Sequence, residues 1–282
     1  MNLVTGAAGF LGRALMSALE TRNIPAMGVD IKDGDIADPA FLKTLPEKLD
    51  RVFHLAAQTY VPDSWERPQD FIRTNALGTG NILQHCVKNK TPVTLISGYL
   101  YGTPEQLPIP ESHPLTAGNP YGLSKKLAEE MGEFYHRVHN VPITIIRPFN
   151  IYGPGQNIKF LIPTIIDQVL NGDKVEILDL APKRDFLFYE DLVEALILTR
   201  DCTGGLEKFN IGSGYSIDVK EVIDTIQRVA GTDKPVHSKE IRRQNEVMDV
   251  VADITRAKTQ LGWTPRHSFE DGIRKIIKNP AQ

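Results

Sequence analysis

TGAAGFLG, residues 5–12, is the stretch that decides the fold of this chain. A short apolar run, Asn2 to Val4, precedes it. The residues that follow place Leu11, Leu15 and Leu19 on one face of a helix, at steps of four. The pattern predicts a strand that enters a glycine-rich turn and continues into a helix.

The three glycines of this turn have roles that follow from their missing side chains. Gly6 permits the tight turn, Gly9 lets a diphosphate approach the backbone, and Gly12 allows the helix to pack closely on the strand. Because the helix begins here, its unpaired N–H groups and its partial positive charge face the same place. The turn therefore predicts a binding site for the diphosphate of a dinucleotide cofactor.

Asp30 extends this prediction to the adenosine end of the cofactor. It lies eighteen residues after Gly12 and closes a second strand-like run, Ala26 to Val29. A carboxylate there accepts hydrogen bonds from the two free hydroxyls of a ribose and repels a 2′-phosphate, which favours NAD over NADP. Lys32 close by weakens this preference and keeps NADP open as an alternative.

Apolar strand-like runs alternate with amphipathic helices farther along the chain. The predicted strands are Arg51–Leu55, Val93–Ile96 and Ile143–Ile146, and the predicted helices are Pro68–Lys88 and Tyr121–His139. Such alternation is typical of βαβ units. It predicts an α/β fold with a doubly wound parallel sheet, whose ligand crevice lies at the carboxyl ends of the strands.

A change in sequence texture predicts a smaller C-terminal lobe. After Asn150 the elements become shorter and richer in Pro and Gly, and Gly153-Pro154-Gly155 marks the seam. We expect residues 1–155 to form the cofactor-binding domain, with residues 186–213 returning to it. Residues 156–282 are expected to form a substrate-binding lobe.

Composition excludes several classes of protein. With 282 residues, of which 41% are hydrophobic, and a net charge of −3, the chain can bury a sizeable core and has no excess of the basic residues that nucleic-acid binders carry. No apolar run approaches the roughly 18 residues of a membrane span, and the opening residues leave no room for a signal peptide. We therefore expect a cytoplasmic protein with neither nucleic acid nor membrane as a partner. The two cysteines, Cys86 and Cys202, have neither CxxC spacing nor a nearby histidine cluster, so no metal site is expected.

The candidate catalyst is a tyrosine and a lysine on one helical face. Tyr121 and Lys125 lie four residues apart, directly after Asn119-Pro120. The ammonium is expected to stabilise the phenolate and to lower the tyrosine pKa from its reference value of about 10. An isolated pair at this spacing would more often be a solvated surface pair. Ser97, at the end of a predicted strand, favours catalysis because its hydroxyl can hold the same reacting oxygen.

Structural roles are expected for other conspicuous residues. His54 closes an apolar strand and is predicted to be a packed, hydrogen-bonded core residue. Trp263 is expected to anchor the C-terminal lobe. The charge run of Lys125-Lys126 and Glu129-Glu130 is expected to be a solvated helix face, apart from Lys125 itself.

These motifs, taken in order, resemble those of the extended short-chain dehydrogenases/reductases. More narrowly, they are similar to the NAD-dependent nucleotide-sugar epimerase/dehydratase family, which includes the UDP-glucose 4-epimerases. The resemblance spans nearly the whole chain and is carried by TGAAGFLG (5–12), HLAAQ (54–58), NPYGLSK (119–125), RPFNIYGPGQ (147–156), RDFLFYED (184–191), FNIGSG (209–214) and LGWTP (261–265). It implies a Rossmann-type domain, an NAD cofactor with NADP as the alternative, a nucleoside diphosphate sugar as substrate, a role in carbohydrate biosynthesis and a homodimer.

The resemblance also implies the roles of particular residues. Ser97, Tyr121 and Lys125 would form the catalytic triad, with Tyr121 as the acid/base and Lys125 also binding the nicotinamide ribose. Asn150, Arg184 and Arg243 would bind the substrate, the two arginines at its diphosphate. For a single arginine, the default alternative is a surface ion pair with Asp185 or Glu246. Further cofactor contacts are implied for Gly6, Gly9, Phe10, Leu11, Gly12, Asp30, Asp35, Ile36, Leu55, Ala56, Ala57, Asn75 and Pro148.

Departures from the family pattern bear on the reaction. The 4,6-dehydratases usually carry an Asp-Glu pair directly after the catalytic Ser or Thr, where this chain has Gly98 and Tyr99. Neither residue moves a proton as a carboxyl group does, so dehydration is disfavoured. Only five positions separate Asp30 from Asp35, which predicts a more open adenine end and a cofactor that exchanges more easily.

Three functions follow from this pattern. We expect an NAD-dependent 4-epimerase of a nucleoside diphosphate sugar that acts through a transient 4-keto intermediate. The alternative is an NAD(P)H-dependent 4-ketoreductase of a nucleotide-linked deoxysugar. A catalytically silent dinucleotide-binding sensor is a third hypothesis, which is less favoured because such a module has no need of a paired Tyr and Lys.

Overall fold

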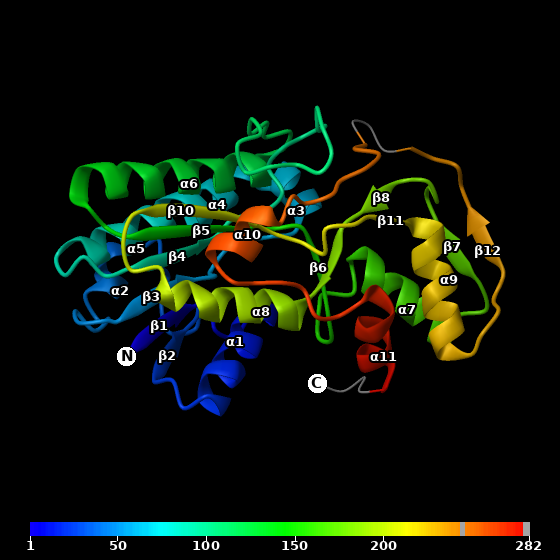
Figure 1. The fold of residues 1–282 in the computed structure, drawn as a ribbon, viewed down its shortest axis with the longest axis horizontal. Coiled ribbons are helices and arrows are strands. Elements are labelled where there is room, and N and C mark those ends of the chain that lie inside the picture. Colours follow the sequence, from blue (N-terminus) through cyan, green and yellow to red (C-terminus); the bar gives the residue numbers. More distant parts are fainter. Residues whose placement is uncertain (243–245, 279–282) are drawn as a thin grey trace.

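A six-stranded parallel sheet lies at the centre of the computed structural model, which describes residues 1–242 and 246–278 (Figure 1). Its strands are β1 (Asn2–Thr5), β2 (Ala26–Val29), β3 (Arg51–His54), β4 (Val93–Ile96), β5 (Ile143–Pro148) and β10 (Leu206–Ile211), in the spatial order β10-β5-β4-β3-β1-β2. All neighbouring strands run parallel. The chain passes outward from β1 on both sides, so a ligand crevice is expected between β1 and β3. The predicted fold class is confirmed.

Helices cover both faces of this sheet (Figure 1). One face carries α1 (Phe10–Thr21) and α8 (Tyr189–Leu198), which pack on each other. The other face carries α3 (Val61–Glu66), α4 (Pro68–Phe71), η1 (Ile72–Leu77), α5 (Gly78–Val87) and α6 (Pro120–His139). The helix predicted over 68–88 is thus a run of three helical segments, and its middle segment, η1, is π-helical. Hydrophobic periodicity does not reveal such a wider turn.

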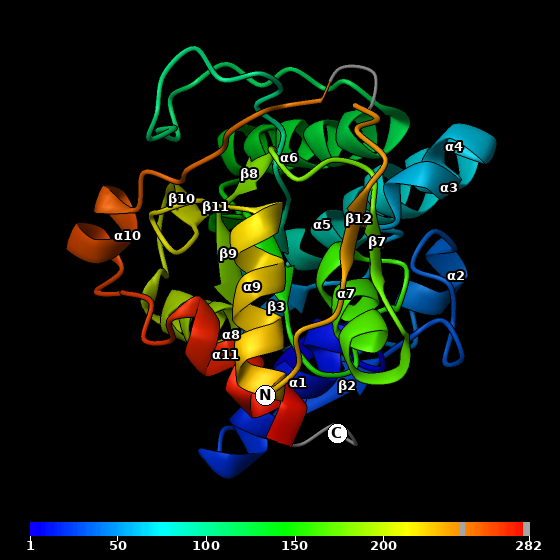
Figure 2. The same ribbon diagram turned by 90° about the vertical axis from the view of Figure 1, so that its right-hand side faces the viewer.

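A second, smaller group of elements lies beyond the carboxyl ends of the central strands (Figure 2). It contains α7 (Leu161–Asn171), α9 (Val219–Ala230) and α11 (Phe269–Lys278), together with the pairs β7 (Val175–Ile177) with β12 (Val236–Ser238) and β8 (Lys183–Arg184) with β11 (Ile217–Asp218). Its core is separate and includes Ile165, Val222 and Ile273. The parallel pair of β6 (Asn150–Tyr152) and β9 (Phe186–Phe188) joins this group to the sheet.

The remaining elements are α2 (Pro39–Leu42), η2 (Thr199–Asp201) and α10 (Thr255–Gln260). Residues from 250 to 263 pack into the same hydrophobic cluster as Val4 and Leu15, and Trp263 donates a hydrogen bond from Nε1 to the Asp191 carbonyl at 2.8 Å. The division into residues 1–155 and 156–282 stays a prediction. Within the described ranges, no helix combines the length and the apolar character needed to cross a bilayer.

Candidate active site

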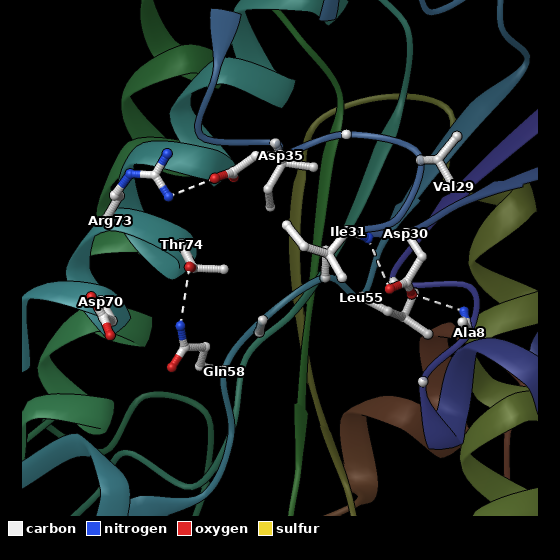
Figure 3. Close-up of a pocket in the computed structure, with 16 residues that line it drawn as sticks. Ala8, Val29, Asp30, Ile31, Asp35, Leu55, Gln58, Asp70, Arg73 and Thr74 are labelled. Atoms are coloured by element: carbon white, nitrogen blue, oxygen red, sulfur yellow. Dashed lines mark hydrogen bonds and ion pairs between the residues drawn. The ribbon is translucent and has the colours of Figure 1, made fainter. Parts of the chain in front are cut away.

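A cavity of about 640 Å³ opens at the carboxyl ends of β1, β2 and β3 (Figure 3). The segments that follow these three strands supply most of its wall, and η1 supplies the side opposite the glycine-rich turn. The cavity therefore lies where the strand order predicts it. Its lining consists of Gly6, Ala8, Gly9, Val29, Asp30, Ile31, Gly34, Asp35, Ile36, Leu55, Ala56, Ala57, Gln58, Asp70, Arg73 and Thr74.

The glycine-rich turn has the shape that a bound diphosphate requires. Gly6 has a φ of +71°, and a Cβ at this position would lie 2.7 Å from the Ala56 nitrogen. A Cβ on Gly12 would overlap the Gly6 carbonyl oxygen, so this helix can lie against the turn only with glycine there. No side chain caps the start of α1 at Gly9, which leaves the first N–H groups of the helix free for a phosphate. These features fit a dinucleotide.

Asp30 and Asp35 both line the cavity, Asp30 beside Ala8 and Asp35 beside Arg73 (Figure 3). The Asp30 carboxylate accepts hydrogen bonds from the backbone N–H groups of Ala8, at 2.9 Å, and Ile31, at 2.8 Å. Asp35 accepts from the Ala37 N–H at 2.8 Å and forms an ion pair of 2.5 Å with Arg73. Partial burial raises the Asp35 pKa, but the Ala37 amide and the Arg73 guanidinium outweigh it and hold this pKa below its usual value.

Sequence reasoning assigned Leu55, Ala56 and Ala57 in the loop after β3, and all three line the cavity. It missed Arg73 and Thr74 on η1. Arg73 is 38 residues from Asp35, and no motif joins the two. Their meeting depends on how η1 lies over the ends of the strands. Gln58 was part of the HLAAQ motif but was not assigned to the cofactor, although its Nε2 donates to Thr74 Oγ1 at 3.4 Å across this wall.

Several predicted cofactor residues lie outside this cavity: Phe10, Leu11, Gly12, Asn75, Tyr121, Lys125 and Pro148. Asn75 is buried, and its amide is fully used within the protein. It accepts from the Gln58 N–H at 2.8 Å and donates to the Gln58 carbonyl and to Ser124 Oγ. Asn75 thus ties the wall of the cavity to the first turns of α6.

The start of α6 places Tyr121 beside the end of β4. Asn119 caps the helix by accepting from the Gly122 N–H at 2.8 Å. A Cβ on Gly98 would lie 2.8 Å from the Tyr121 hydroxyl, so this hydroxyl occupies the space next to the residue that follows Ser97. The Ser97 hydroxyl is buried and has no hydrogen-bond partner among residues 1–242 and 246–278. The structure thus brings Tyr121 to the Ser97 segment, with an unpaired hydroxyl available there.

Burial dominates the pKa values of this group. It raises the Tyr121 pKa to about 12 and lowers the Lys125 pKa to about 8, while the negative charge of Glu129 acts on Lys125 in the opposite direction. The prediction that the tyrosine pKa lies below its reference value is wrong for this structure, because burial disfavours the charged phenolate. Tyr121 is therefore a proton donor near neutral pH. Lys125 is 6% exposed, and no described residue pairs with its Nζ.

His54 lies behind this site as a core residue, which confirms the prediction. Its Nδ1 lies 2.8 Å from Thr5 Oγ1 and its Nε2 2.9 Å from Thr79 Oγ1. The Thr79 hydroxyl donates to the Asn75 carbonyl, so it accepts from His54 Nε2–H, and Nδ1 accepts from Thr5. Burial, with a smaller effect of the Lys125 charge, lowers the His54 pKa to about 3. This histidine is neutral and structural.

On the substrate side, Arg184 is engaged with the protein itself. Its guanidinium forms an ion pair with Glu246 and donates to the Val247 carbonyl at 2.6 Å. The ion pair named as the alternative reading is therefore present, and phosphate binding by Arg184 stays a prediction. Asn150 Nδ2 donates to the Asp185 carbonyl at 3.3 Å. Arg243 lies outside the described residues.

Glu129 differs from the sequence-based expectation. Glu129 and Arg147 are each only 2% exposed and form a buried ion pair, so Glu129 does not belong to a solvated helix face. The prediction failed because Glu129 lies on the side of α6 that packs on β5. This strand is mostly apolar but contains Arg147, which pairs with Glu129. The sequence signal was the Arg at 147, inside a run of apolar residues.

Comparisons with known proteins agree with this geometry. The family model described as GDP-mannose 4,6 dehydratase matches residues 20–276. The GDP-6-deoxy-D-mannose reductase of Pseudomonas aeruginosa is 30% identical over 98% of this chain and 95% of its own.

Two solved structures carry the likeness to the level of the fold. The UDP-glucose 4-epimerase of Thermotoga maritima, solved with UDP-glucose, superposes with a TM-score of 0.92 at 28% identity and covers 99% of this chain and 98% of its own. The UDP-glucose 4-epimerase of Thermus thermophilus, in complex with NAD, has a TM-score of 0.88 at 25% identity, with coverages of 98% and 97%. This chain therefore belongs to the nucleotide-sugar epimerases, dehydratases and reductases of the extended short-chain dehydrogenase/reductase family.

Proposed function

We propose that this protein is an NAD-dependent 4-epimerase of a nucleoside diphosphate sugar. The observation that carries the proposal is the position of the Tyr121 hydroxyl beside Gly98, the residue that follows Ser97, whose own buried hydroxyl has no partner among the described residues. This arrangement offers an acid/base group and a positioning hydroxyl for one sugar oxygen, and Gly98 and Tyr99, which follow Ser97, supply no carboxyl group.

The cofactor would be held by the glycine-rich turn, by Asp30 and by Lys125. When bound, NAD supplies a hydride acceptor and, in its oxidised form, a positively charged ring. The exposed N–H groups at the start of α1 would bind the diphosphate, and Asp30 would accept from the adenosine ribose. The relative from Thermus thermophilus is solved with NAD, which supports this choice.

The chain's own residues divide the work on the sugar. Tyr121 would take the proton of the 4-hydroxyl as its phenolate, a form that the positive charges of Lys125 and of the oxidised nicotinamide ring would favour, and would return this proton as the phenol when the 4-keto group is reduced. Ser97 would hold the 4-oxygen through its free hydroxyl. Arg184 would bind the substrate diphosphate, for which it must exchange its partner Glu246 for phosphate oxygens.

Dehydration lacks its acid and base in this chain. Gly98 has no side chain, and the Tyr99 hydroxyl donates to the Gly102 carbonyl at 2.6 Å. Burial raises the pKa of Tyr99 well above its usual value, so it stays protonated at any pH at which the enzyme would work. Hydride transfer at C4 thus needs only groups that are present at Ser97 and on α6. Loss of water across C5 and C6 needs an additional acid and base, which Gly98 and Tyr99 do not supply.

The test is inversion at C4. The purified protein with NAD and UDP-glucose, UDP-galactose or their N-acetylated counterparts should give the 4-epimer, measured by proton NMR. Tyr121→Phe should bind NAD as the wild type does and lose turnover by about 10³-fold or more. If the wild type binds these nucleotide sugars with NAD and inverts none, the proposal is wrong.

The second candidate is a 4-ketoreductase, favoured by the short segment between Asp30 and Asp35, which predicts a more open adenine end. Arg73 is half-exposed where it lines the cavity, and its guanidinium would bind the 2′-phosphate of NADP. The similarity to the Pseudomonas aeruginosa reductase agrees with this alternative. Stoichiometric loss of NAD(P)H absorbance with a 4-keto nucleotide sugar, without inversion of any 4-hydroxy sugar, would establish the reductase instead.

We further propose a homodimer formed through η1 and α6. Leu77, Leu123, Phe134 and Val138 are large apolar side chains that these segments leave exposed. A dimer mass by light scattering would support this, and Phe134→Glu should shift the protein towards the monomer. A cytoplasmic location and a role in carbohydrate biosynthesis stay predictions.

A further inference from the structure

A buried ion pair lies one helical turn behind Lys125. The Glu129 carboxylate accepts from Arg147 Nε at 3.0 and 3.2 Å and from Nη2 at 2.7 Å, so carboxylate and guanidinium meet in a fork. Lys125 and Glu129 are four residues apart on α6 and are both buried. The carboxylate therefore binds an arginine of β5 from a position one turn after Lys125 on the helix.

The pair is part of a network that ends at the other side of the site. Arg147 Nη1 donates to the Tyr101 hydroxyl at 3.0 Å and to the Glu111 carbonyl at 2.9 Å. Tyr101 donates to Asn210 Oδ1 at 2.5 Å, and the Asn210 N–H donates to the Glu111 carboxylate at 2.9 Å. Tyr101 lies four residues after Ser97. The network thus joins the helix of Tyr121 to the segment of Ser97.

Stability alone does not explain such a pair. Removing two charges from water costs several kcal/mol for each ion, and the attraction between them rarely does more than offset this cost. Apolar residues of the same volume would often hold α6 on β5 at least as well. A second role of the Glu129 charge, beyond its ion pair with Arg147, would explain why a buried ion pair stands here in place of apolar residues.

Lys125 is the group that this charge reaches. The titratable groups near Lys125 are Tyr121 and Glu129 on α6 and His54 on β3, while η1 contributes the neutral Asn75, which binds Ser124. Arg147 on β5 reaches this group through its ion pair with Glu129. His54 is neutral, and Tyr121 is protonated. Among the described residues in this group, Glu129 is the one that carries a negative charge.

We propose that Glu129 is a positioning residue that keeps Lys125 protonated and directed towards Tyr121, with Arg147 fixing the carboxylate in place. This inference rests on the proposed function, in which Lys125 serves the acid/base step. Without the carboxylate, two cations, Lys125 and Arg147, share a buried space, and the lysine is the one that can lose its proton.

The test is the titration of Lys125 itself, measured without cofactor or substrate. In protein labelled with ¹³C at lysine Cε, the Lys125 resonance is assigned by its absence in Lys125→Met. Glu129→Gln should lower the midpoint of its titration by about one pH unit or more. Glu130→Gln is the matched control, because it makes the same change at the next residue, where the side chain is exposed and pairs with Lys126. It should leave the midpoint unchanged.

The activity profile gives a second measurement. Glu129→Gln should move the alkaline limb of kcat/KM to lower pH by the same amount, so that the loss is greater at pH 8.5 than at pH 6.5, roughly tenfold greater for a one-unit shift. A merely structural role would instead lower the activity by one factor at every pH. An unchanged Lys125 midpoint in folded Glu129→Gln protein would overturn the proposal.

A double variant covers the case in which Glu129→Gln does not fold. Glu129→Gln with Arg147→Met removes both charges together and leaves no unpaired ion, and it should still lower the Lys125 midpoint. A wild-type midpoint in the folded double variant would also overturn the inference. Because the NMR titration needs no turnover, it separates a failure of this inference from a failure of the proposed epimerase.

Discussion

Lys125 illustrates at the scale of one residue how this site costs stability. Burial lowers its pKa from 10.5 to about 8, so its protonated form is disfavoured in the folded protein. Between these values the unfolded chain binds more protons, and the free energy of unfolding therefore rises with pH. The cost is fully present below about pH 8 and disappears above about pH 10.5.

Replacing this lysine should therefore stabilise the protein. We expect Lys125→Met to raise the free energy of unfolding by about 3 kcal/mol at pH 7, which is the shift of its pKa converted to energy, and to do so less as the pH approaches 10.5. Urea denaturation at several pH values measures this. Lys126→Met, the neighbouring and less buried lysine, should change stability by no more than about 0.5 kcal/mol. An equal gain at pH 7 and pH 10 would contradict the linkage.

The proposed role of Arg184 is to bind the substrate, and its replacement tests this role. Arg184→Met should raise KM for the nucleotide sugar by about 10- to 100-fold, since a charge-assisted hydrogen bond contributes about 1.5–3 kcal/mol, and should change kcat much less. Arg242→Met, an exposed arginine close in space to Asp179, is the control and should leave KM unchanged. Initial rates over a range of substrate concentrations distinguish the two. A similar KM for wild type and Arg184→Met would remove Arg184 from the substrate site.

Single residues were predictable where a motif states their chemistry. The glycines of the turn, Asp30 and Tyr121 could be assigned from the sequence because each belongs to a local pattern with a physical meaning. Arg73 and Glu129 could not, because their partners lie 38 and 18 residues away and meet them only in the fold. The direction of the Tyr121 pKa was missed for the same reason: burial is not visible in the spacing of a Tyr and a Lys.

At the scale of elements, α6 holds the catalytic tyrosine through its cap. Asn119 →Ala should lower the free energy of unfolding by about 1 kcal/mol, because the Gly122 N–H loses its acceptor. It should also lower kcat, because Tyr121 lies in the same turn. The opposite end of the helix supplies the control: Asn140 has a φ of +52°, and Asn140→Gly should keep kcat and the stability within about 0.5 kcal/mol. Thermal unfolding with initial rates measures both, and a larger loss of kcat in Asn140→Gly would contradict the assignment.

The positions of elements were more predictable than their internal geometry. The alternation of strand and helix patterns placed β2, β4 and α6 to within a residue or so, since buried parallel strands and amphipathic helices have different periods. The π-helical turn of η1 was not predictable, because residues 68–88 keep a helical pattern throughout. Yet this turn carries Arg73 and Thr74 to the cavity wall and places Asn75 against Gln58.

The whole molecule depends on contacts between the two ends of the chain. Trp263 lies in one cluster with Val4 and Leu15, so Trp263→Ala should lower the free energy of unfolding of the entire chain by about 3–5 kcal/mol. Trp65, the other tryptophan, is mostly exposed, and Trp65→Ala should change stability by no more than about 0.5 kcal/mol. Urea denaturation should show one transition shifted to lower concentration. A transition split in two would mean that Trp263 stabilises only a separate C-terminal lobe.

The class of the fold and the place of its crevice followed from the sequence, because parallel βαβ units leave few arrangements open. The fate of residues 250–263 did not follow. Their apolar side chains predict that these residues are buried, but not that they pack into the same hydrophobic core as β1.

The links between the two groups of elements also limit how the protein can respond to a ligand. The chain passes from one group to the other near Tyr152, Asp185 and Ile211, again between Ser238 and Val250, and finally between Trp263 and Phe269. Rotation of one group about a single hinge would have to bend the backbone at all these connections at once. The two groups should therefore keep their relative positions when substrate binds. Binding should consist of local exchanges of side-chain partners. The radius of gyration measured by solution scattering should be the same before and after binding.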